Sequence, residues 1–243
     1  MRALAVVSAG LLAACSGPPS PDAPPATEVS ATFTVAGDWP SYGRDAGGSR
    51  FSPLRQITPG NVGELRQAWA YALGSDAAPE ASAAGFEFTP LVVGGVLYTA
   101  AAGRVVALQA DSGTELWRQP FAAGAAVPRR GLAYWPGERG QAARVFCIVG
   151  RRLVAIDAAS GRKVESFGVG GEVEMPVSYH GTPAVFEGRL IVGSTTGPGS
   201  IRAYDVRTGA QLWVFSASGD GGAAHTSAGM TVDADRALVY AAF

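Results

Sequence analysis

Short apolar runs separated by glycine-rich turns follow one another along most of this chain. Residues 91–98 form one example, with Gly94-Gly95 between two apolar halves, and residues 184–192 form another around Glu187-Gly188. Apolar runs joined by such a tight turn are typical of antiparallel β-hairpins. The pattern therefore predicts an all-β fold built from many short strands.

A gapless repeat of 48 residues organises these hairpins. Residues 106–113, 154–161 and 202–209 each place an apolar strand before a Ser/Thr-Gly pair, whose glycine suits a turn that needs positive φ. With the hairpin upstream, each unit contains about four strands, and units of this kind indicate a β-propeller whose blades bury their faces against one another. A solenoid of β-hairpins is the structural alternative.

Tryptophans mark the same register. Trp117 and Trp213 each follow the glycine of their unit by four residues, and Trp69 lies 48 residues before Trp117. The middle unit has Glu165 at this place, with Phe167 as the candidate substitute. A large aromatic side chain at one repeat position fills the same packing site in every unit, so we expect these aromatic residues to dock between neighbouring blades.

Composition narrows the function classes. The 243 residues include 19 basic and 20 acidic ones, which gives a formal net charge of −1. Because no positive field is available to attract a polyphosphate backbone, nucleic acid is not an expected partner. Charged residues make up only 16% of the chain, against 33 Gly and 16 Pro, and this balance favours short strands joined by turns.

The first residues predict export rather than a folded element. Arg2 precedes an apolar run over residues 3–14, which is too short to cross a bilayer. Residues 12–15, Leu-Ala-Ala-Cys, resemble the bacterial lipobox, in which the cysteine is lipidated and becomes the mature N-terminus. We expect residues 1–15 to be a lipoprotein signal peptide and Cys15 to carry the lipid; an ordinary cleavage site with a cysteine there by chance is the alternative. Ser16 favours the outer membrane, with the protein facing the periplasm.

Residues 16–36 are rich in Pro, Ala, Ser and Gly and predict a flexible tether. The folded part then covers residues 37–243 and begins near Trp39. With Cys15 lipidated, Cys147 is the only remaining thiol. Because Cys147 lies within an apolar run, we expect it to be a buried strand residue.

Two features resemble one enzyme family. The repeat is best preserved over residues 203–213, Ala-Tyr-Asp-Val-Arg-Thr-Gly-Ala-Gln-Leu-Trp, and resembles the tryptophan-docking repeat of pyrroloquinoline-quinone (PQQ) dehydrogenases. Non-enzymatic envelope propellers share that repeat. More specific are residues 38–44, Asp-Trp-Pro-Ser-Tyr-Gly-Arg, and residues 50–54, Arg-Phe-Ser-Pro-Leu, which are similar to the opening segment of the glucose and quinate dehydrogenases. The resemblance covers residues 38–243 and implies an eight-bladed propeller, of which about four units are present.

The resemblance assigns cofactor contacts to four positions. Glu87, before Phe-Thr-Pro, matches the family's glutamate that hydrogen-bonds PQQ, and Arg130, before a glycine, matches the arginine that pairs with a PQQ carboxylate. Thr195 lies in a small hydroxyl-bearing turn that touches the cofactor, and Thr182 falls near a further contact. A solvated loop residue is the alternative for Glu87, and the start of a strand is the alternative for Thr182.

Other family features are missing. The glucose-dehydrogenase branch has a histidine where this chain has Ala126, which argues against glucose as the substrate. In related enzymes an acidic residue just after the turn of Thr195 ligates Ca²⁺, but here the chain continues Thr-Gly-Pro-Gly, so the implied Ca²⁺ has no identified ligand. His180 and His225 have no partner at metal or triad spacing and are expected to be ordinary loop residues.

The function that the resemblance implies is that of the N-terminal part of a PQQ-dependent dehydrogenase, which oxidises a sugar or other alcohol in the periplasm and passes electrons to a membrane quinone or another acceptor. The family's general base is an Asp from a later blade, so we assign no catalytic residue and expect the fragment alone to be inactive. The chain stops in the apolar residues 238–243, and we expect this stop to fall within a blade; a complete four-bladed propeller is the alternative. A non-enzymatic propeller lipoprotein that binds proteins at the envelope is the alternative function.

Overall fold

The computed structural model describes residues 37–73, 88–101, 103–122, 131–179, 181–194, 199–216 and 229–242. These residues form three four-stranded antiparallel sheets, one two-stranded sheet and a short 3-10 helix, η1 (Val62–Glu64). The predicted all-β fold is confirmed. No helix in this part of the chain is long and apolar enough to span a bilayer. Cys15 and the tether of residues 16–36 lie outside the described residues.

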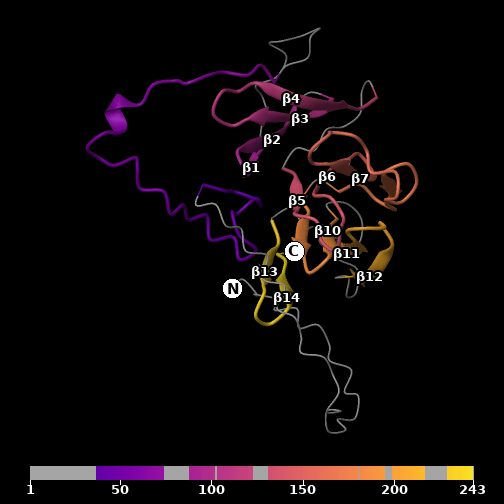
Figure 1. Ribbon diagram of the computed structural model, residues 1–243. Coiled ribbons are helices and arrows are strands. Elements are labelled where there is room, and N and C mark those ends of the chain that lie inside the picture. The colour runs from indigo at the N-terminus through magenta and orange to yellow at the C-terminus, as the bar shows by residue number, and fades with distance from the viewer. Residues whose placement is uncertain are drawn as a thin grey trace.

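Strands that follow one another in the sequence pair side by side in each sheet (Figure 1). The first sheet contains β1 (Leu91–Val93), β2 (Val96–Ala101), β3 (Arg104–Gln109) and β4 (Glu115–Pro120). The second contains β5 (Ala133–Trp135), β6 (Arg144–Val149), β7 (Arg152–Asp157) and β8 (Glu172–Glu174). The third contains β9 (Ala184–Phe186), β10 (Arg189–Gly193), β11 (Ser200–Asp205) and β12 (Gln211–Ser216), and the fourth contains β13 (Thr231–Asp233) and β14 (Leu238–Tyr240). The hairpins predicted over residues 91–98 and 184–192 are β1–β2 and β9–β10.

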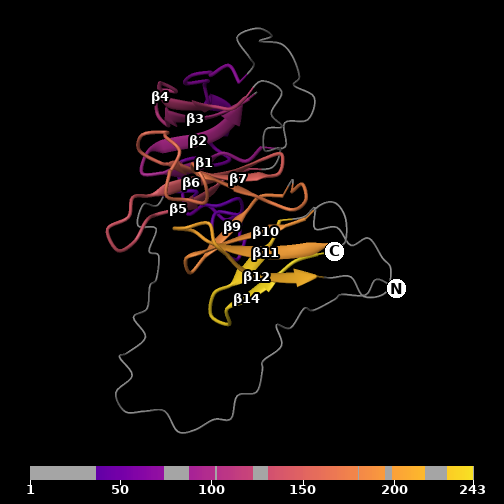
Figure 2. The same cartoon turned by 90° about the vertical axis from the view of Figure 1, so that its right-hand side faces the viewer.

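The sheets follow one another in sequence order and bury their faces between them (Figure 2). All six residues of β6 are buried, including Cys147, because this strand is covered on both faces. Burial raises the pKa of the Cys147 thiol, so it remains a neutral packing group, as predicted. Leu91, Val105 and Val154 lie in the core between the first and second sheets. Phe146, Leu153, Phe167, Tyr179 and Leu190 belong to the core between the second and third.

The repeat appears in three dimensions as one docking site used twice in the same way. Nε1 of Trp69 donates to the carbonyl of Ala110 at 3.1 Å, and Nε1 of Trp117 donates to the carbonyl of Ala158 at 3.0 Å. The Trp69 indole lies against Gly113 and the Trp117 indole lies against Gly161, each the glycine of a Ser-Gly turn. A Cβ at Gly161, whose φ is +73°, would lie 2.6 Å from the Trp117 ring. Glycine is therefore required at this turn for its conformation and for the close approach of the indole.

Phe167 of the middle unit lies at the corresponding site beside Gly209, where it is joined by Val173, whose Cγ2 would lie 2.6 Å from a Cβ on that glycine. The Phe167 side chain is fully buried, and a Cβ at Gly209 would lie 3.3 Å from Cε2 of Phe167. Trp213 differs from the expectation of docking between blades, because its side chain is 38% exposed. Within the part of the chain that the structure describes, β12 forms the outer edge of the third sheet and its indole is not covered as Trp117 is.

The N-terminal segment of residues 37–73 contacts both the first and the fourth sheets. Trp39 and Val92 exchange two backbone hydrogen bonds, of 2.7 and 3.0 Å, at the free edge of β1. The amide of Val232 in β13 donates to the carbonyl of Ala46 at 2.8 Å. Farther along, the hydroxyl of Tyr71 donates to the carboxylate of Glu115 in β4. This segment thus joins sheets that lie far apart in the sequence.

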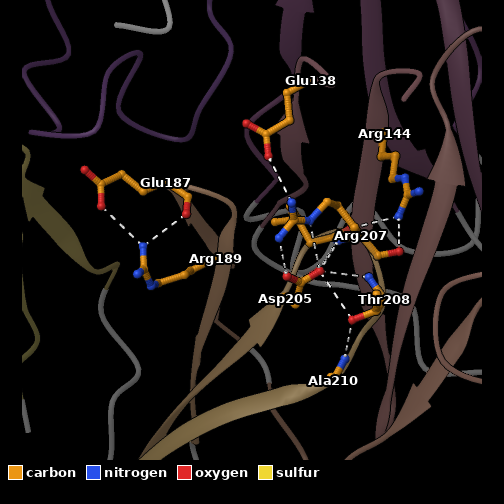
Figure 3. Close-up of polar contacts among 9 residues, drawn as sticks. Glu138, Arg144, Glu187, Arg189, Asp205, Arg207, Thr208 and Ala210 are labelled. Atoms are coloured by element: carbon orange, nitrogen blue, oxygen red, sulfur yellow. Dashed lines mark hydrogen bonds and ion pairs between the residues drawn. The ribbon is translucent and has the colours of Figure 1, made fainter. Parts of the chain in front are cut away.

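A group of polar contacts ties the second sheet to the third beside the Thr208-Gly209 turn (Figure 3). Arg144 donates from one guanidinium nitrogen to the carbonyls of Val206 and Arg207, at 2.8 and 2.7 Å. Asp205 accepts from the amides of Arg207 and Thr208 and pairs with the Arg207 guanidinium at 2.9 Å. Burial opposes the ionisation of Asp205, but the hydrogen bonds from Arg207 and Thr208 outweigh it and lower its pKa to about 2. These contacts explain how the turn is held.

Candidate cofactor site

The topology gives each sheet two different ends. We call the end at which β1, β5, β9 and β13 begin the leading end. Because adjacent strands are antiparallel, the β2–β3, β6–β7 and β10–β11 connections share this end, whereas the Ser/Thr-Gly turns lie at the opposite one, the glycine-turn end. Glu87, Arg130 and Thr182 precede β1, β5 and β9 by four, three and two residues, and Thr195 follows β10 by two. The described residues that flank these positions, Phe88, Gly131, Thr182 and Ser194, therefore belong to the leading end.

Of the four candidate cofactor residues, Thr182 is described. Glu87, Arg130 and Thr195 lie outside the described residues, as do His180 and His225. The geometry of the site is therefore that of Thr182 and of the described residues next to the other three.

The second and third sheets meet at the leading end through Gly131 and Thr182. Gly131 has a φ of +140°, and a Cβ built on it would lie 3.1 Å from Oγ1 and 3.3 Å from Cγ2 of Thr182. Thr182 is 9% exposed, and Leu132, next to Gly131, is fully buried. Since adjacent Cα atoms are about 3.8 Å apart, Arg130 is joined to this contact by one peptide bond. Two candidates from different sheets are thus connected through the bare backbone of Gly131.

The sequence left two interpretations for Thr182, a cofactor contact and the start of a strand. It lies outside β9, which begins at Ala184, so it leads into a strand without belonging to it. Its side chain is buried against Gly131 rather than directed into solvent. The Thr182 hydroxyl thus lies close to the backbone of Gly131, the residue after Arg130.

The β10–β11 connection departs from its counterparts. Two residues connect β2 to β3 and β6 to β7, whereas six residues, 194–199, connect β10 to β11. The amide of Ser194 donates to the carbonyl of Ser200 at 2.8 Å, and the amide of Ser200 donates to Oγ of Ser194 at 2.7 Å. Both serines are buried, and they close the base of the longer loop. The predicted contact Thr195 follows Ser194 directly.

Apolar packing also holds the chain at the start of the first sheet. Phe88, which follows Glu87, packs against the core that contains Leu91 and Leu132. Leu91 and Leu132 are fully buried. The backbone after Glu87 is therefore anchored by side chains of the same core that anchors the backbone after Arg130.

The residues at the leading end fit a flat, polyanionic cofactor such as PQQ. Gly131 supplies a stretch of backbone without a Cβ, and Thr182 and Ser194 supply buried hydroxyls. A metal site is not built in the same way. Within the described ranges, no group of three or more His, Cys, Asp or Glu side chains is arranged to hold an ion, so these residues do not by themselves form the Ca²⁺ site implied by the resemblance.

Sequence reasoning missed Gly131 and the Ser194–Ser200 pair. Gly131 was visible as the residue after Arg130, but nothing local to the chain indicates that it lies against Thr182. For the serines, a usable signal was present. The repeat puts two residues between the second and third strands of the first two units and more in the third, and an insertion at one end of a repeat often marks a binding face.

Comparison with known proteins decides which family carries this arrangement. The model of the PQQ-type β-propeller domain of glucose, ethanol and alcohol dehydrogenases matches residues 39–243. The chain belongs to the PQQ-dependent dehydrogenase family. This membership confirms the predicted propeller of PQQ-type repeats and does not favour the solenoid.

Three curated relatives in this family are 33–35% identical to the chain over the aligned residues. It is 35% identical over 203 residues to 1-butanol dehydrogenase (cytochrome c) of Thauera butanivorans, covering 78% of this chain and 28% of the relative. It is 33% identical to quinohemoprotein alcohol dehydrogenase of Comamonas testosteroni, covering 86% and 32%. It is 34% identical to quinoprotein glucose dehydrogenase of Escherichia coli, covering 82% and 29%. The chain thus spans between a quarter and a third of these relatives' length.

Solved structures agree with this assignment. The quinohemoprotein alcohol dehydrogenase of Comamonas testosteroni has a TM-score of 0.69 and 27% identity over 84% of this chain and 35% of its own. The alcohol dehydrogenase ADHIIG of Pseudomonas putida has a TM-score of 0.70 and 27% identity over 87% of this chain and 35% of its own. The sheets described above therefore have the arrangement of a PQQ dehydrogenase propeller.

Proposed function

We propose that this chain supplies cofactor contacts at the leading end of a PQQ-dependent dehydrogenase that oxidises an alcohol or a sugar. The observation that carries the proposal is the meeting of Gly131, next to Arg130, with Thr182 at the end where the longer β10–β11 loop begins. The named relatives are dehydrogenases, which supports an enzyme over a protein-binding scaffold. The scaffold alternative is therefore not favoured.

The chain's residues bind and orient the cofactor in this proposal. When bound, PQQ supplies the acceptor for the two electrons and the hydrogen that leave the hydroxyl-bearing carbon of the substrate. Arg130 pairs with a carboxylate through two parallel N–H donors, and Glu87 accepts a hydrogen bond. Thr182 and Thr195 donate from their hydroxyls, and the buried side chains of this end keep water away. No residue of this chain is assigned the role of general base.

The names of the relatives support the proposed substrate and acceptor. The names of the relatives include alcohol, glucose and quinate/shikimate dehydrogenases, with cytochrome c or a quinone as acceptor. Ala126, at the place of the histidine of the glucose branch, favours an alcohol over glucose. We expect electrons to pass to a membrane quinone or a cytochrome.

The location is part of the proposal. The lipobox at Cys15 and the tether of residues 16–36 support a lipoprotein anchored in the cell envelope, with its propeller in the periplasm and the outer membrane favoured by Ser16. Replacing Cys15 (Cys15→Ser) is expected to move the protein from the membrane fraction to the soluble fraction. Retention of this variant in the membrane would exclude the lipid anchor.

Reconstitution tests the function. The intact gene product, prepared without cofactor, is mixed with PQQ and Ca²⁺, and dye reduction is followed with 1-butanol or with glucose. We expect PQQ-dependent activity with the alcohol, and a loss of PQQ affinity of about 10- to 100-fold in Arg130→Gln, because a charged hydrogen bond is worth about 1.5–3 kcal/mol. Arg162→Gln and Glu165→Gln, exposed changes in the β7–β8 connection, are the matched controls for Arg130→Gln and Glu87→Gln. If the wild type neither binds PQQ nor shows turnover, the scaffold alternative is favoured.

A further inference from the structure

We propose that residues 38–50 form a strap that pins the fourth sheet to the first across the inner side of the propeller, and that this strap holds the leading end in the shape that binds the cofactor. The pinning does not depend on the proposed function, whereas the effect on cofactor affinity rests on it. Figure 1 shows this segment, in indigo, beside β1 and β13.

The strap pairs with strand edges that the sheets themselves leave free. In the described part of the chain, β1, β5, β9 and β13 each pair with one other strand of their sheet. At the free edge of β1, both backbone groups of Val92 bond to Trp39, and at the free edge of β13 the amide of Val232 donates to the carbonyl of Ala46 at 2.8 Å. Ala46 follows Trp39 by seven residues, so their Cα atoms lie at most about 25 Å apart. One short segment therefore spans the inner side between two sheets.

The second and third sheets have no such partner. The middle residues of β5 and β9, Tyr134 and Val185, have the place in their strands that Val92 and Val232 have in theirs. Among the described residues, no backbone group outside their own sheets bonds to the backbone of Tyr134 or Val185. The strap thus joins the first and last of the four sheets and leaves the inner edges of the middle two, at whose leading end the candidate site lies, without a backbone partner.

The strap is a closed loop with a fixed conformation. The amide of Arg50 donates to the carbonyl of Gly43 at 2.9 Å, and a Cβ on Gly43 would overlap Cα of Gly48 and lie 3.1 Å from its carbonyl carbon. Asp45 accepts hydrogen bonds from the amide and the hydroxyl of Ser49. Arg50 has a φ of +52°, which a residue with a side chain adopts where its surroundings impose it. The loop that pairs with β13 is therefore held by its own contacts.

The strap also reaches the leading end of the fourth sheet. Gly229 precedes β13 by two residues, as Thr182 precedes β9. A Cβ on Gly229 would lie 3.6 Å from Cδ1 and Cε1 of Tyr42, which is an ordinary van der Waals distance. The guanidinium of Arg50 lies over the same ring, 5.1 Å from its centroid. Tyr42 thus places the strap beside the chain that enters β13.

The position of the strap gives it a mechanical effect on the candidate site. The four sheets follow one another around the inner side, and a chord that joins the two ends of an arc fixes its curvature. The strap therefore limits how far the leading ends of the sheets can move apart. A ligand that contacts several sheets binds more tightly when their spacing is set before it arrives.

Hydrogen exchange without cofactor, on the intact gene product, tests the pinning. Gly43→Ala puts a methyl group against backbone atoms of Gly48, which have no rotamer that avoids it, so we expect the loop to open and the Val232 amide to exchange at least about tenfold faster. Gly47→Ala is the matched control, because its Cβ would meet only Oδ1 of Asp45, at 3.5 Å, and we expect a change of less than about threefold. Equal exchange of Val232 in the two variants would overturn the strap.

A milder variant keeps the test open if Gly43→Ala does not fold, as judged by circular dichroism. Asp45→Ala removes both hydrogen bonds from Ser49 without adding an atom, and we expect the Val232 amide to exchange at least about threefold faster than in the wild type. Residues 144–149 of β6, in the second sheet, are the internal reference and are expected to keep their exchange rates. An increase that includes β6 to the same extent, or none at Val232, would overturn the pinning.

Titration with PQQ tests the effect on the site. We expect Gly43→Ala to weaken PQQ binding by at least about tenfold and Gly47→Ala by less than about threefold. If the Val232 amide is released while PQQ affinity is unchanged, the strap does not shape the site and that half of the proposal is wrong. If the wild type does not bind PQQ, the proposed function and the effect on affinity fail together, and the exchange of Val232 still decides the pinning.

Discussion

Strands β4 and β12 occupy the same place in two sheets, yet their tryptophans differ in burial. Both strands pair with the third strand of their sheet, and both ladders shift register at the same point, after Ala107 in one and Ala203 in the other. Trp117 is 9% exposed and Trp213 is 38% exposed. The difference lies outside the strand, because Trp117 docks on the Ser-Gly turn of the next sheet. A strand's own sequence thus sets its place in a sheet, whereas the neighbouring sheet decides what is buried.

Replacing each tryptophan in turn is expected to give the largest difference in the free energy of unfolding. Trp117→Ala is expected to lower the free energy of unfolding by about 3–5 kcal/mol, because it empties a buried aromatic site and loses the hydrogen bond to Ala158. Trp213→Ala is expected to cost less than about 1 kcal/mol in the same chain, because its side chain is already partly in water. Urea denaturation measures both, and similar losses would show that the exposure of Trp213 does not describe the protein in solution.

A change to the docking glycine tests the other side of the contact. Gly161→Ala is expected to cost about 2–4 kcal/mol, because the methyl group would meet the Trp117 ring in addition to the strain of positive φ. Gly150→Ala, with φ of +63° and nothing within 4 Å of its Cβ, isolates that strain and is expected to cost about 1 kcal/mol. Thermal or urea unfolding of the pair checks this. If the two costs are equal, crowding against the indole contributes nothing.

The third and first Ser/Thr-Gly turns share a backbone hydrogen bond but differ in their side-chain cap. Gly209 donates to the carbonyl of Asp205, and Gly113 donates to that of Gln109, so of these two turns the third has a carboxylate at this place and the first does not. The pKa of Asp205 is lowered from 3.8 to about 2, so its stabilisation is complete above pH 3.8 and lost as the pH falls through about 2. We expect Asp205→Asn to cost about 1–2 kcal/mol at pH 7 and only a small fraction of that once the pH falls to about 2. A cost independent of pH would contradict this assignment.

Adding the missing cap should have the smallest effect. Gln109→Asp places a carboxylate where Asp205 lies in the third unit and can accept from the amides of its own turn. We expect a gain of about 0.5–1 kcal/mol in the free energy of unfolding at pH 7, with no gain near pH 2. A loss of stability at pH 7 would show that the two turns are not equivalent.

The sequence predicted most of the fold because the repeat is a local pattern repeated at a fixed distance. It placed the hairpins, the Ser/Thr-Gly turns and even the substitution of Phe167 for tryptophan. It could not predict the burial of Trp213, since that depends on the sheet beside it. Arg144 was also missed, because its acceptors are backbone carbonyls, which leave no trace in a sequence.

The candidate site was likewise predicted only in part from the sequence. The resemblance supplied Glu87, Arg130, Thr182 and Thr195, and the described residues that flank these positions belong to one end of the sheets. Gly131 escaped prediction because its requirement for glycine arises from Thr182, a residue of another blade. Unlike the docking of Trp69 and Trp117, the contact of Gly131 with Thr182 has no counterpart at the repeat spacing, so it becomes visible only in three dimensions.

Hydrogen exchange with and without PQQ tests the central claim most directly, because it shows which end of the sheets the cofactor covers. At saturating PQQ, we predict slower amide exchange in residues 88–91, 131–133, 181–184 and 194–200 at the leading end, and unchanged exchange in residues 94–95, 137–141 and 208–210 at the opposite end. Protection confined to the second set, or saturable binding without protection of the first, would contradict the account.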